Sequence, residues 1–259
     1  MDLQPIHGVP ALMAGDCLIV TDLHIGLESH LRSKGFHIAS RTEDMLESLI
    51  GAAGSEARSL IVLGDVKDSV PGSTKQEYGE IPVFFERLLN RFDEVGVVRG
   101  NHDTMIEDFL PDDVRVHPAT GIRIGDVGLA HGHTWPSARV MSSETLVMGH
   151  DHPAVMLTDG AGGRSTEPCW VRGRFARESS DRYERLPKGF VIVPAFNRML
   201  GGSPVNVEGE PLLGPVMGGD LLDIDGSRVH LLDGIDLGRV SDIRIGAPES
   251  GFRRRRVKK

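Results

Sequence analysis

The sequence has few aromatic residues, two cysteines and no long apolar run. Aromatic side chains make up 5% of the 259 residues, and Cys17 and Cys169 cannot form a disulfide framework. No stretch approaches the roughly 20 apolar residues of a membrane span. Met1–Gln4 is not followed by the basic and apolar segments of a secretory signal. These absences predict a protein of the reducing cytoplasm with no membrane partner.

Basic residues are outnumbered by acidic ones, which gives a formal net charge of −8. Six positive charges lie in the last seven residues, Arg253–Lys259, so the rest of the chain is more acidic still. Such a body repels nucleic acid unless metals or a local basic patch offset its charge. The tail could be that patch, although a solvated terminus is the simpler interpretation. We expect a single domain over residues 1–247 and a mobile basic tail over 248–259.

Short apolar runs in the first 150 residues predict buried strands. The overall contents of 39% hydrophobic and 25% charged residues are typical of globular proteins. The runs Cys17–Val20, Leu60–Leu63 and Val95–Val98 each end in a polar cluster. Helix-like segments separate these runs, and this alternation is typical of a largely parallel sheet. Polar groups then collect at the carboxyl ends of the strands.

Two of the intervening segments carry helix signals. Ser40–Glu43 has the pattern of a capping box, and the apolar positions from Met45 to Ile50 follow it at helical spacing. The segment Val83–Leu89 has a similar apolar stripe. We therefore expect a helix after each of the first two strands.

The pattern changes after about residue 110, where strands follow one another with few helix signals between them. This predicts a second sheet, with strands near Val127–Ala130, Thr145–Met148, Ala154–Leu157, Cys169–Val171 and Phe190–Val193. Gly160–Gly163 is interpreted as a hairpin tip, because it lacks the Gly-Lys-Ser/Thr ending of a phosphate-binding loop. Gly201–Gly219 is expected to be a long loop. Leu221–Ile224 and Val229–Leu232 are expected to form a closing hairpin across Asp225-Gly226.

Five polar clusters carry the chemistry of the chain. In order they are Asp22-Leu23-His24, Gly64-Asp65, Gly100-Asn101-His102-Asp103, His131-Gly132-His133 and Gly149-His150-Asp151-His152. Each cluster alone is weak evidence, but the ordered set, with four members directly after apolar runs, is strong. Carboxylates and imidazoles without thiolates suit Mn, Fe or Zn rather than a structural zinc site. In an Asp-x-His pair at a strand end, both side chains share one face.

The ordered series resembles the calcineurin-like metallophosphoesterase superfamily from Asp22 to His152. Further details resemble archaeal phosphoesterases related to SbcD-type nucleases and, in outline, a bacterial group associated with DNA ligase. Those details are Gly64-Asp65-Val66-Lys67, His131–Pro136, Gly149–Pro153, Pro194–Asn197 and Gly201-Gly202. The resemblance implies an α/β fold, a four-layer α/β/β/α sandwich of two mixed sheets flanked by helices.

The resemblance also implies two divalent metal ions, most readily Mn, with Fe, Zn or Ni as alternatives. The implied ligands are Asp22, His24 and His152 for the first metal, Asn101, His131 and His150 for the second, and Asp65 between them. His102 is the implied catalytic histidine, and Asp103 is expected to orient it. In such a centre a hydroxide held by the two metals attacks phosphorus, so neither Cys17 nor a serine is needed as nucleophile. The sequence contains no Gly-x-Ser-x-Gly elbow either.

Several polar and aromatic residues near the clusters are consistent with more than one role. His131 and His133 compete for one ligand position, and we favour His131 because it follows the strand directly and matches the family motif. Lys67 is equally consistent with a phosphate contact and with a solvated side chain. Trp135 could stack on a base, but packing under its loop is the simpler interpretation.

These observations favour a metal-dependent phosphodiesterase that acts on a phosphate ester, with nucleic acid or a small nucleotide diester as substrate. A phosphomonoesterase or pyrophosphohydrolase on the same site is the alternative, and a non-catalytic scaffold is a third hypothesis. All seven ligand positions and His102 are present, which counts against the scaffold. Gly64–Val70 lacks the arginine of related protein Ser/Thr phosphatases, which counts against that activity.

Overall fold

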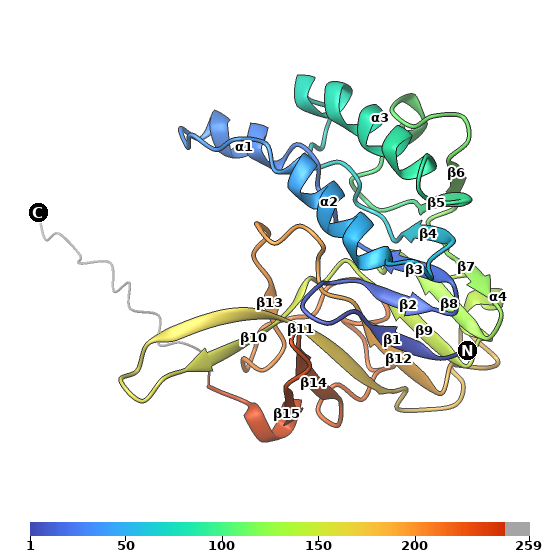
Figure 1. Ribbon diagram of the computed structural model, residues 1–259. Coiled ribbons are helices and arrows are strands. Elements are labelled where there is room, and N and C mark those ends of the chain that lie inside the picture. Colours follow the sequence, from blue (N-terminus) through green and yellow to red (C-terminus); the bar gives the residue numbers. More distant parts are fainter. Residues whose placement is uncertain (247–259) are drawn as a thin grey trace, which may run out of the picture.

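The computed structural model describes residues 1–246, and its framework is two β-sheets packed against each other (Figure 1). The first sheet is built entirely from the amino-terminal part of the chain. Its strands run in the order β1 (Leu3–Pro5), β2 (Leu12–Ala14), β3 (Cys17–Val20), β4 (Ser59–Val62), β5 (Glu94–Val98) and β6 (Arg115–His117). The strands β3 to β6 are parallel, whereas β1, β2 and β3 pair antiparallel.

The second sheet follows in sequence and is also mixed. Its strands are β7 (Ile122–Ile124), β8 (Val127–Ala130), β9 (Thr145–Met148), β10 (Pro153–Thr158), β11 (Arg164–Arg174), β12 (Gly189–Ile192) and β13 (Ser203–Pro204). They are arranged in the order β13-β10-β11-β12-β9-β8-β7, with β8, β9 and β12 parallel. Two late strands, β14 (Arg228–Leu231) and β15 (Asp236–Arg239), extend from β11.

Helices cover the outer face of the first sheet (Figure 1). Helices α2 (Thr42–Ala53) and α3 (Lys75–Leu89) form this cover. The structure also has α1 (Leu27–Ser33), the short α4 (Ala138–Met141), which packs on the second sheet, and 3-10 turns at Ile106–Asp108 and Val240–Ile243. The expected capping box at Ser40 does not form on α2, because Arg41 occupies the N-cap and its side chain makes no capping hydrogen bond. The capping box is instead on α3, between Thr74 and Glu77.

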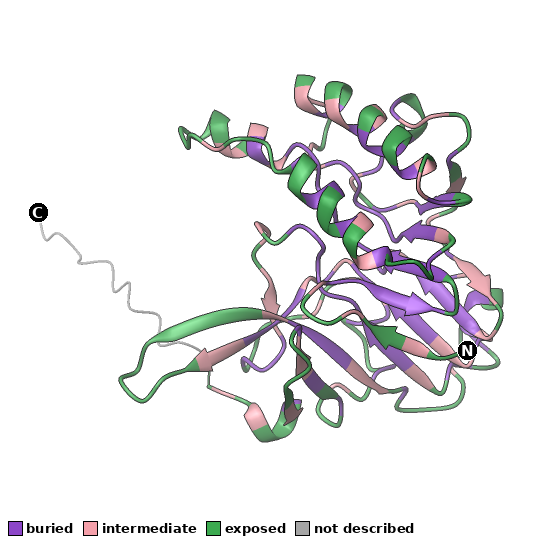
Figure 2. Cartoon of the chain, in the orientation of Figure 1, coloured by how far each residue is buried: buried purple, intermediate pink, exposed green. Residues whose placement is uncertain are grey.

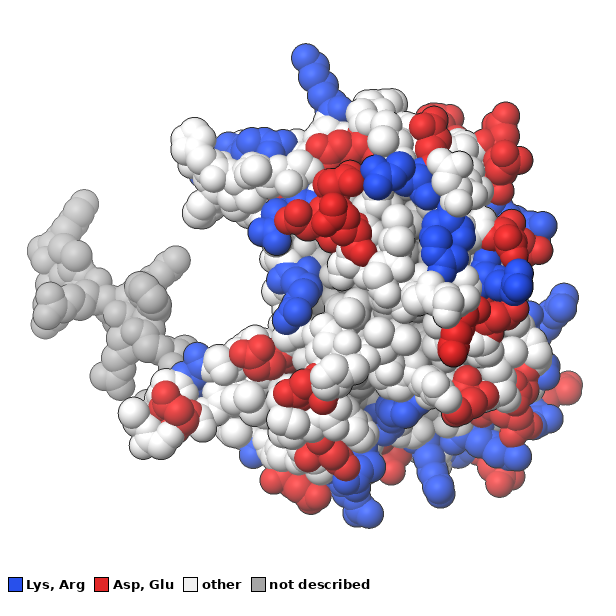
Figure 3. Space-filling view, in the orientation of Figure 1, with Lys and Arg blue, Asp and Glu red and all other residues white. Residues whose placement is uncertain are grey.

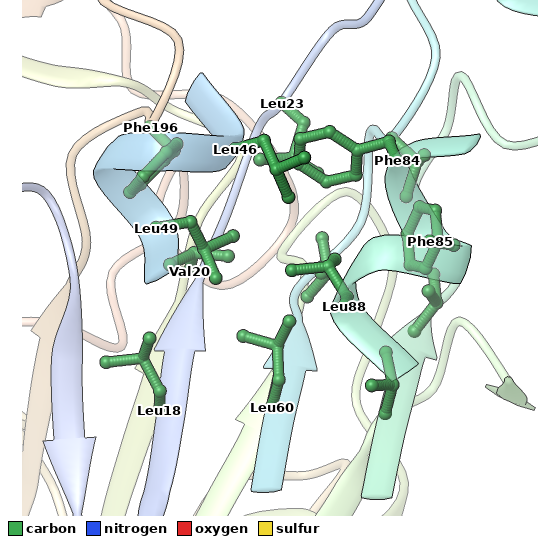
Figure 4. Packing of buried hydrophobic residues seen from close by; sticks show 14 of the residues in the cluster. Leu18, Val20, Leu23, Leu46, Leu49, Leu60, Phe84, Phe85, Leu88 and Phe196 are labelled. Atoms are coloured by element: carbon green, nitrogen blue, oxygen red, sulfur yellow. The ribbon is translucent and has the colours of Figure 1, made fainter. Parts of the chain in front are cut away.

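Three apolar layers hold these elements together. Leu46 and Leu49 of α2 and Leu88 of α3 pack on the first sheet around Leu18 and Leu60 (Figure 4). A second layer lies between the sheets, and a third covers the far face of the second sheet with α4 and loop segments. Figure 2 shows buried residues concentrated along the inner strands. Burying each such side chain stabilises the fold by about 1.5–3 kcal/mol, so the strands are held rigidly under their loops.

The predicted fold of two mixed sheets flanked by helices is confirmed, and so is the hairpin tip at residues 160–163. The closing hairpin differs from the prediction, because β14 pairs with β15 and residues 221–224 form no strand. The expected tail at 248–259 lies outside the described residues, and the single domain over 1–247 stays a prediction. Among residues 1–246, no helix combines the length and apolar character needed to cross a membrane.

Candidate metal centre

The polar clusters meet at one edge of the two sheets. Asp22 and His24 follow β3, Asp65 follows β4, and Asn101 and His102 follow β5. From the second sheet, His131 follows β8, and His150 and His152 follow β9. Within the first sheet β3, β4 and β5 are parallel to one another, and within the second sheet β8 and β9 are parallel. Their carboxyl ends therefore lie together, where open α/β sheets collect functional groups.

The side chains at this edge form two groups that could each hold a cation. Asp22, His24 and His152 bring one potential ligand atom each to within 4.8 Å of one another, and Asp65, His131 and His150 do the same. We call these the first and second triads. Asp65 links them, because its Oδ2 atom lies 3.5 Å from His24 Nε2 and 3.3 Å from His131 Nε2.

The first triad contains buried polar atoms that have no hydrogen-bond partner. These atoms are Asp22 Oδ1, His24 Nε2 and His152 Nε2. The other atoms of these residues are occupied: Asp22 Oδ2 accepts from Thr21 Oγ1 and from the His150 amide, and His24 Nδ1 faces Asp68. Leaving buried polar atoms unpaired is costly. A divalent cation that prefers oxygen and imidazole ligands would satisfy all three, so the residues fit the implied metal.

In the second triad, the His131 ring is oriented with its Nε2 atom toward the other potential ligands. His131 Nδ1 lies 2.6 Å from the Leu63 carbonyl oxygen, which can only accept, so this nitrogen carries the proton. His131 Nε2 therefore faces Asp65, and it lies 3.2 Å from Asn101 Oδ1. A carbonyl partner of this kind fixes the ring orientation of a metal-ligating histidine. Asn101 Oδ1 therefore lies beside the second triad.

The closely spaced carboxylates and imidazoles shift one another's pKa values strongly. Burial lowers the pKa of His24, but the neighbouring carboxylates of Asp65 and Asp68 raise it to about 10. For His131, burial is likewise outweighed by Asp65, which raises the pKa to about 9. Burial raises the pKa of Asp65, yet His131 and His24 hold it well below its usual range. Protonated imidazoles are therefore the favoured partners of these carboxylates when no metal is bound.

The backbone at these ligands is unusual. Among the described residues, six non-glycine residues have positive φ, and five of them are expected ligands: Asp22 (56°), His24 (41°), Asp65 (51°), His150 (70°) and His152 (45°). Each left-handed residue of this kind costs free energy and persists only where its surroundings enforce it. Such strain concentrates at functional sites, which supports a functional role for this edge.

Two glycines allow the ligand loops to approach one another. A Cβ atom on Gly100 would lie 2.2 Å from Asp65 Oδ1 and 2.3 Å from the Asp65 amide nitrogen. A Cβ atom on Gly149 would lie 1.9 Å from Thr21 Oγ1 and 2.9 Å from Asp22 Oδ2. Any side chain at either position would displace an expected ligand.

His102 is held differently from our expectation. The carboxylate of Asp103 is fully buried and accepts hydrogen bonds from the Val66 and Gly100 amides, both at 2.8 Å. It therefore braces the loops after β4 and β5 rather than the imidazole of His102. The Nδ1 atom of His102 instead lies 2.5 Å from the main-chain carbonyl oxygen of Asp68. The His102 amide also donates to Asp65 Oδ1 at 2.9 Å.

The loop that contains Asp68 positions two site histidines, a role that the sequence pattern does not indicate. The buried Lys67 ammonium donates to the carbonyl oxygens of Ser69 and Gly72, at 2.5 and 2.9 Å. The buried Glu77 carboxylate accepts from the Asp68 and Ser69 amides, at 3.0 and 2.7 Å. Lys67 therefore holds the loop that orients His24 and His102. This role differs from both the phosphate contact and the solvated side chain considered from the sequence.

The other residues near the centre lie beside the triads. The imidazole of His133 packs against His131 and His150, with ring centroids 5.2 and 6.0 Å apart. Trp135 is partly buried, and the Arg182 guanidinium lies 4.9 Å from its ring centroid, so packing accounts for it. Asp151 is buried and accepts from the Leu213 amide at 2.8 Å, and burial raises its pKa to about 7.

The α/β sandwich thus carries two carboxylate–imidazole triads at its strand ends, each a candidate site for a cation. The model of the calcineurin-like phosphoesterase family matches residues 17–178, which span both triads. The chain therefore belongs to the calcineurin-like phosphoesterase family. A comparison with curated proteins finds no match.

The chain is also similar to several solved structures. The nuclease MPE of Pseudomonas putida is 22% identical, with a TM-score of 0.51, and the match covers 90% of this chain and 98% of that one. The phosphoesterase YfcE of E. coli is 16% identical, with a TM-score of 0.38 and coverages of 86% and 97%. A metallophosphoesterase of Sphaerobacter thermophilus is 15% identical, with a TM-score of 0.35 and coverages of 88% and 90%.

Proposed function

We propose that this chain is a phosphodiesterase that uses two divalent metal ions, with Mn as the physiological metal. The observation that carries the proposal is the position of Asp65 between the two triads, within 3.5 Å of a histidine from each. Asp22, His24 and His152 would hold one ion, and His131, His150 and Asn101 the other. The family membership and the fold shared with a bacterial nuclease support this assignment.

The residues divide the chemistry between them. When bound, the two cations would supply a hydroxide-like nucleophile and neutralise charge on the phosphate oxygens. As the new phosphorus–oxygen bond forms, the bond to the leaving oxygen breaks, and His102 gives that oxygen a proton from Nε2. The Asp68 carbonyl keeps Nδ1 protonated and so aims Nε2 away from the loop. No side chain becomes phosphorylated in this scheme.

We further propose that the protein hydrolyses diesters in preference to monoesters. It rests on the motif resemblance to SbcD-related phosphoesterases and on the nuclease fold. A nucleic acid or a nucleotide diester is the proposed substrate. The cytoplasmic location expected from the two cysteines stays a prediction, and both cysteines are buried free thiols in the structure.

The test compares two chromogenic esters with metal-stripped protein resupplied with Mn. Bis-p-nitrophenyl phosphate should be hydrolysed, and Asp65→Asn should abolish both turnover and tight binding of two Mn ions. Asp93→Asn, an exposed carboxylate away from the centre, is the matched control. Turnover of p-nitrophenyl phosphate alone would replace the proposal with a phosphomonoesterase. Two bound ions without turnover of either ester would favour a scaffold.

A further inference from the structure

A loop between β12 and β13 bridges the two chain segments that supply the first triad. It corresponds to Ala195–Gly202 and appears in orange, leading into β13, in Figure 1. At its start, the buried Asn197 side chain donates to the Leu23 carbonyl oxygen at 3.0 Å, and the Asn197 amide donates to the Asp22 carbonyl oxygen. This end of the loop is therefore fixed to the segment that contains Asp22 and His24.

The other end of the loop is fixed to His152. The Ser203 amide donates to the His152 carbonyl oxygen at 3.0 Å. Gly202 lies so close to this strand that a Cβ atom there would be 2.8 Å from the same oxygen and 2.4 Å from Ala154 Cβ. The loop thus spans the first triad from one ligand segment to the other, and its geometry is set by the ligands' own backbone.

Arg198 lies at the exposed part of this loop, directly after the buried Asn197. Within residues 1–246, its guanidinium has no hydrogen bond or ion pair. Other arginines near the surface, such as Arg177, Arg185 and Arg228, are paired with carboxylates. On the face shown in Figure 3, basic side chains are interspersed with acidic ones over most of the surface. Exposed arginines elsewhere, such as Arg164 and Arg174, also have no partner among the described residues, so the distinguishing feature of Arg198 is its position in a cavity shared with His152 of the first triad.

The surroundings of Arg198 fit a nucleotide unit. A cavity of about 370 Å³ is lined by Arg198 and by His152 of the first triad, together with apolar groups of Pro153, Pro168 and Leu200. A second cavity of about 380 Å³ lies on the other side, and Arg198 lines that cavity too. Volumes of this size hold a small ligand, and guanidinium groups bind phosphate through paired N–H donors.

We infer that Arg198 binds a phosphate group next to the scissile phosphate of a polynucleotide, with the adjoining nucleoside in the cavity beside His152. The inference rests on the proposed phosphodiesterase function and names its substrate class. A monoester or a small aryl diester has no second phosphate, so Arg198 contributes to selection of a polymer and not to the bond-breaking step. Glu167 lines the same cavity and should oppose a polyanion there.

The test measures Arg198→Ala on two substrates. With a single-stranded DNA oligonucleotide, KM should rise about tenfold and the slope of log affinity against log salt should fall by about one. With bis-p-nitrophenyl phosphate, kcat/KM should stay within about twofold. Arg198→Lys should keep most of the salt slope, because it keeps the charge. Equal losses on both substrates would overturn the inference, since Arg198 would then support the metal centre itself.

Controls separate this inference from the proposed function. Arg58→Ala, an exposed arginine before β4 at the opposite edge of the sheet, should change neither substrate. Glu167→Gln should lower KM for the oligonucleotide. Equilibrium binding of the oligonucleotide, measured by anisotropy in the His102→Ala background with and without Arg198→Ala, does not depend on turnover. Unchanged binding would overturn the inference while the diesterase stands. If Arg198→Ala weakened binding but the wild-type protein hydrolysed neither substrate, only the proposed diesterase activity would be ruled out.

Discussion

The Nδ1 atom of His102 lies 2.5 Å from the main-chain carbonyl oxygen of Asp68. Because a carbonyl oxygen can only accept, Nδ1 carries one proton, and in the imidazolium form Nε2 holds the second proton, which it can give to the leaving oxygen. Through its carboxylate, Asp68 also lies 3.1 Å from His24 Nδ1. One residue therefore orients both an expected metal ligand and the expected acid, so the acid and the metal centre are positioned together.

His102→Ala should leave metal binding intact and remove proton donation to the leaving group. Turnover of bis-p-nitrophenyl phosphate should fall by about 10²–10⁴-fold, the range of general acid catalysis. Metal content by elemental analysis should stay at the wild-type value, and His133→Ala serves as a neighbouring control. Loss of a metal ion in His102→Ala would instead make this histidine a ligand.

Lys67→Met should disturb the loop that holds His102. The substitution leaves the Ser69 and Gly72 carbonyl oxygens without their buried donor. We expect the free energy of unfolding, measured with urea, to fall by about 1–3 kcal/mol and kcat to fall with it. Lys188→Met removes an exposed lysine paired with Glu144 and should change stability by less than about 0.5 kcal/mol. Wild-type kcat in Lys67→Met would show that the loop does not need this anchor.

Gly100→Ala should displace Asp65, because the added Cβ would meet both the carboxylate and the backbone of that residue. We expect loss of bound metal and of activity. Gly79→Ala, in the middle of α3 with nothing within 4 Å of the new Cβ, should instead stabilise the fold by about 0.5–1 kcal/mol. Metal stoichiometry and thermal melting of the two variants provide the comparison. Normal metal binding in Gly100→Ala would contradict the packing described above.

The metal-free protein should lose stability as the pH rises above neutrality. His24 and His131 have pKa values raised to about 10 and about 9, above the ordinary value near 6.5. Their protonated forms stabilise the fold fully below about pH 6.5, and this contribution is lost as the pH rises through 9 to 10. The lowered pKa of Asp65 acts in the opposite direction, since its contribution is lost only on acidification.

Urea unfolding of chelator-treated protein at about pH 6, 8 and 10 measures this decline. Asp65→Asn should flatten it, because both histidines lose the carboxylate that raises their pKa. Adding Mn should restore stability at high pH, since a cation takes the place of the protons. A metal-free protein that becomes more stable between pH 7 and 10 would rule out the coupled imidazole–carboxylate arrangement.

The strands and their polar ends were predictable because both depend on local pattern. Val127–Ala130 and Thr145–Met148 are strands with the expected bounds, and the clusters that follow them meet as expected. Helix starts were harder. Ser40 and Thr74 both begin Ser/Thr-x-x-Glu sequences, but the Ser40 hydroxyl bonds Glu80 and Thr42 in the folded chain. Tertiary partners therefore decided which of the two became a capping box.

The orientation of the site residues was not predictable for a related reason. The family resemblance made Asp103 the expected partner of the His102 imidazole. The folded chain uses Asp103 to pair buried amides and brings Asp68, from a different loop, to the imidazole. Likewise, nothing local in Pro194–Asn197 indicates that Asn197 binds the Leu23 carbonyl, 174 residues away in the chain. Contacts of this range exist only once both sheets are packed.

The division of the sheets along the chain has a consequence for assembly. The first sheet ends at His117 and the second begins at Ile122, yet each triad takes ligands from both sides of this junction. A cation in either triad would act as a cross-link between two halves that a single short linker joins covalently and an apolar layer holds together. Cutting the chain at residues 118–121 would leave two polypeptides, each with an incomplete share of both ion sites. Divalent metal should then strengthen their reassociation beyond what the apolar layer between the sheets provides.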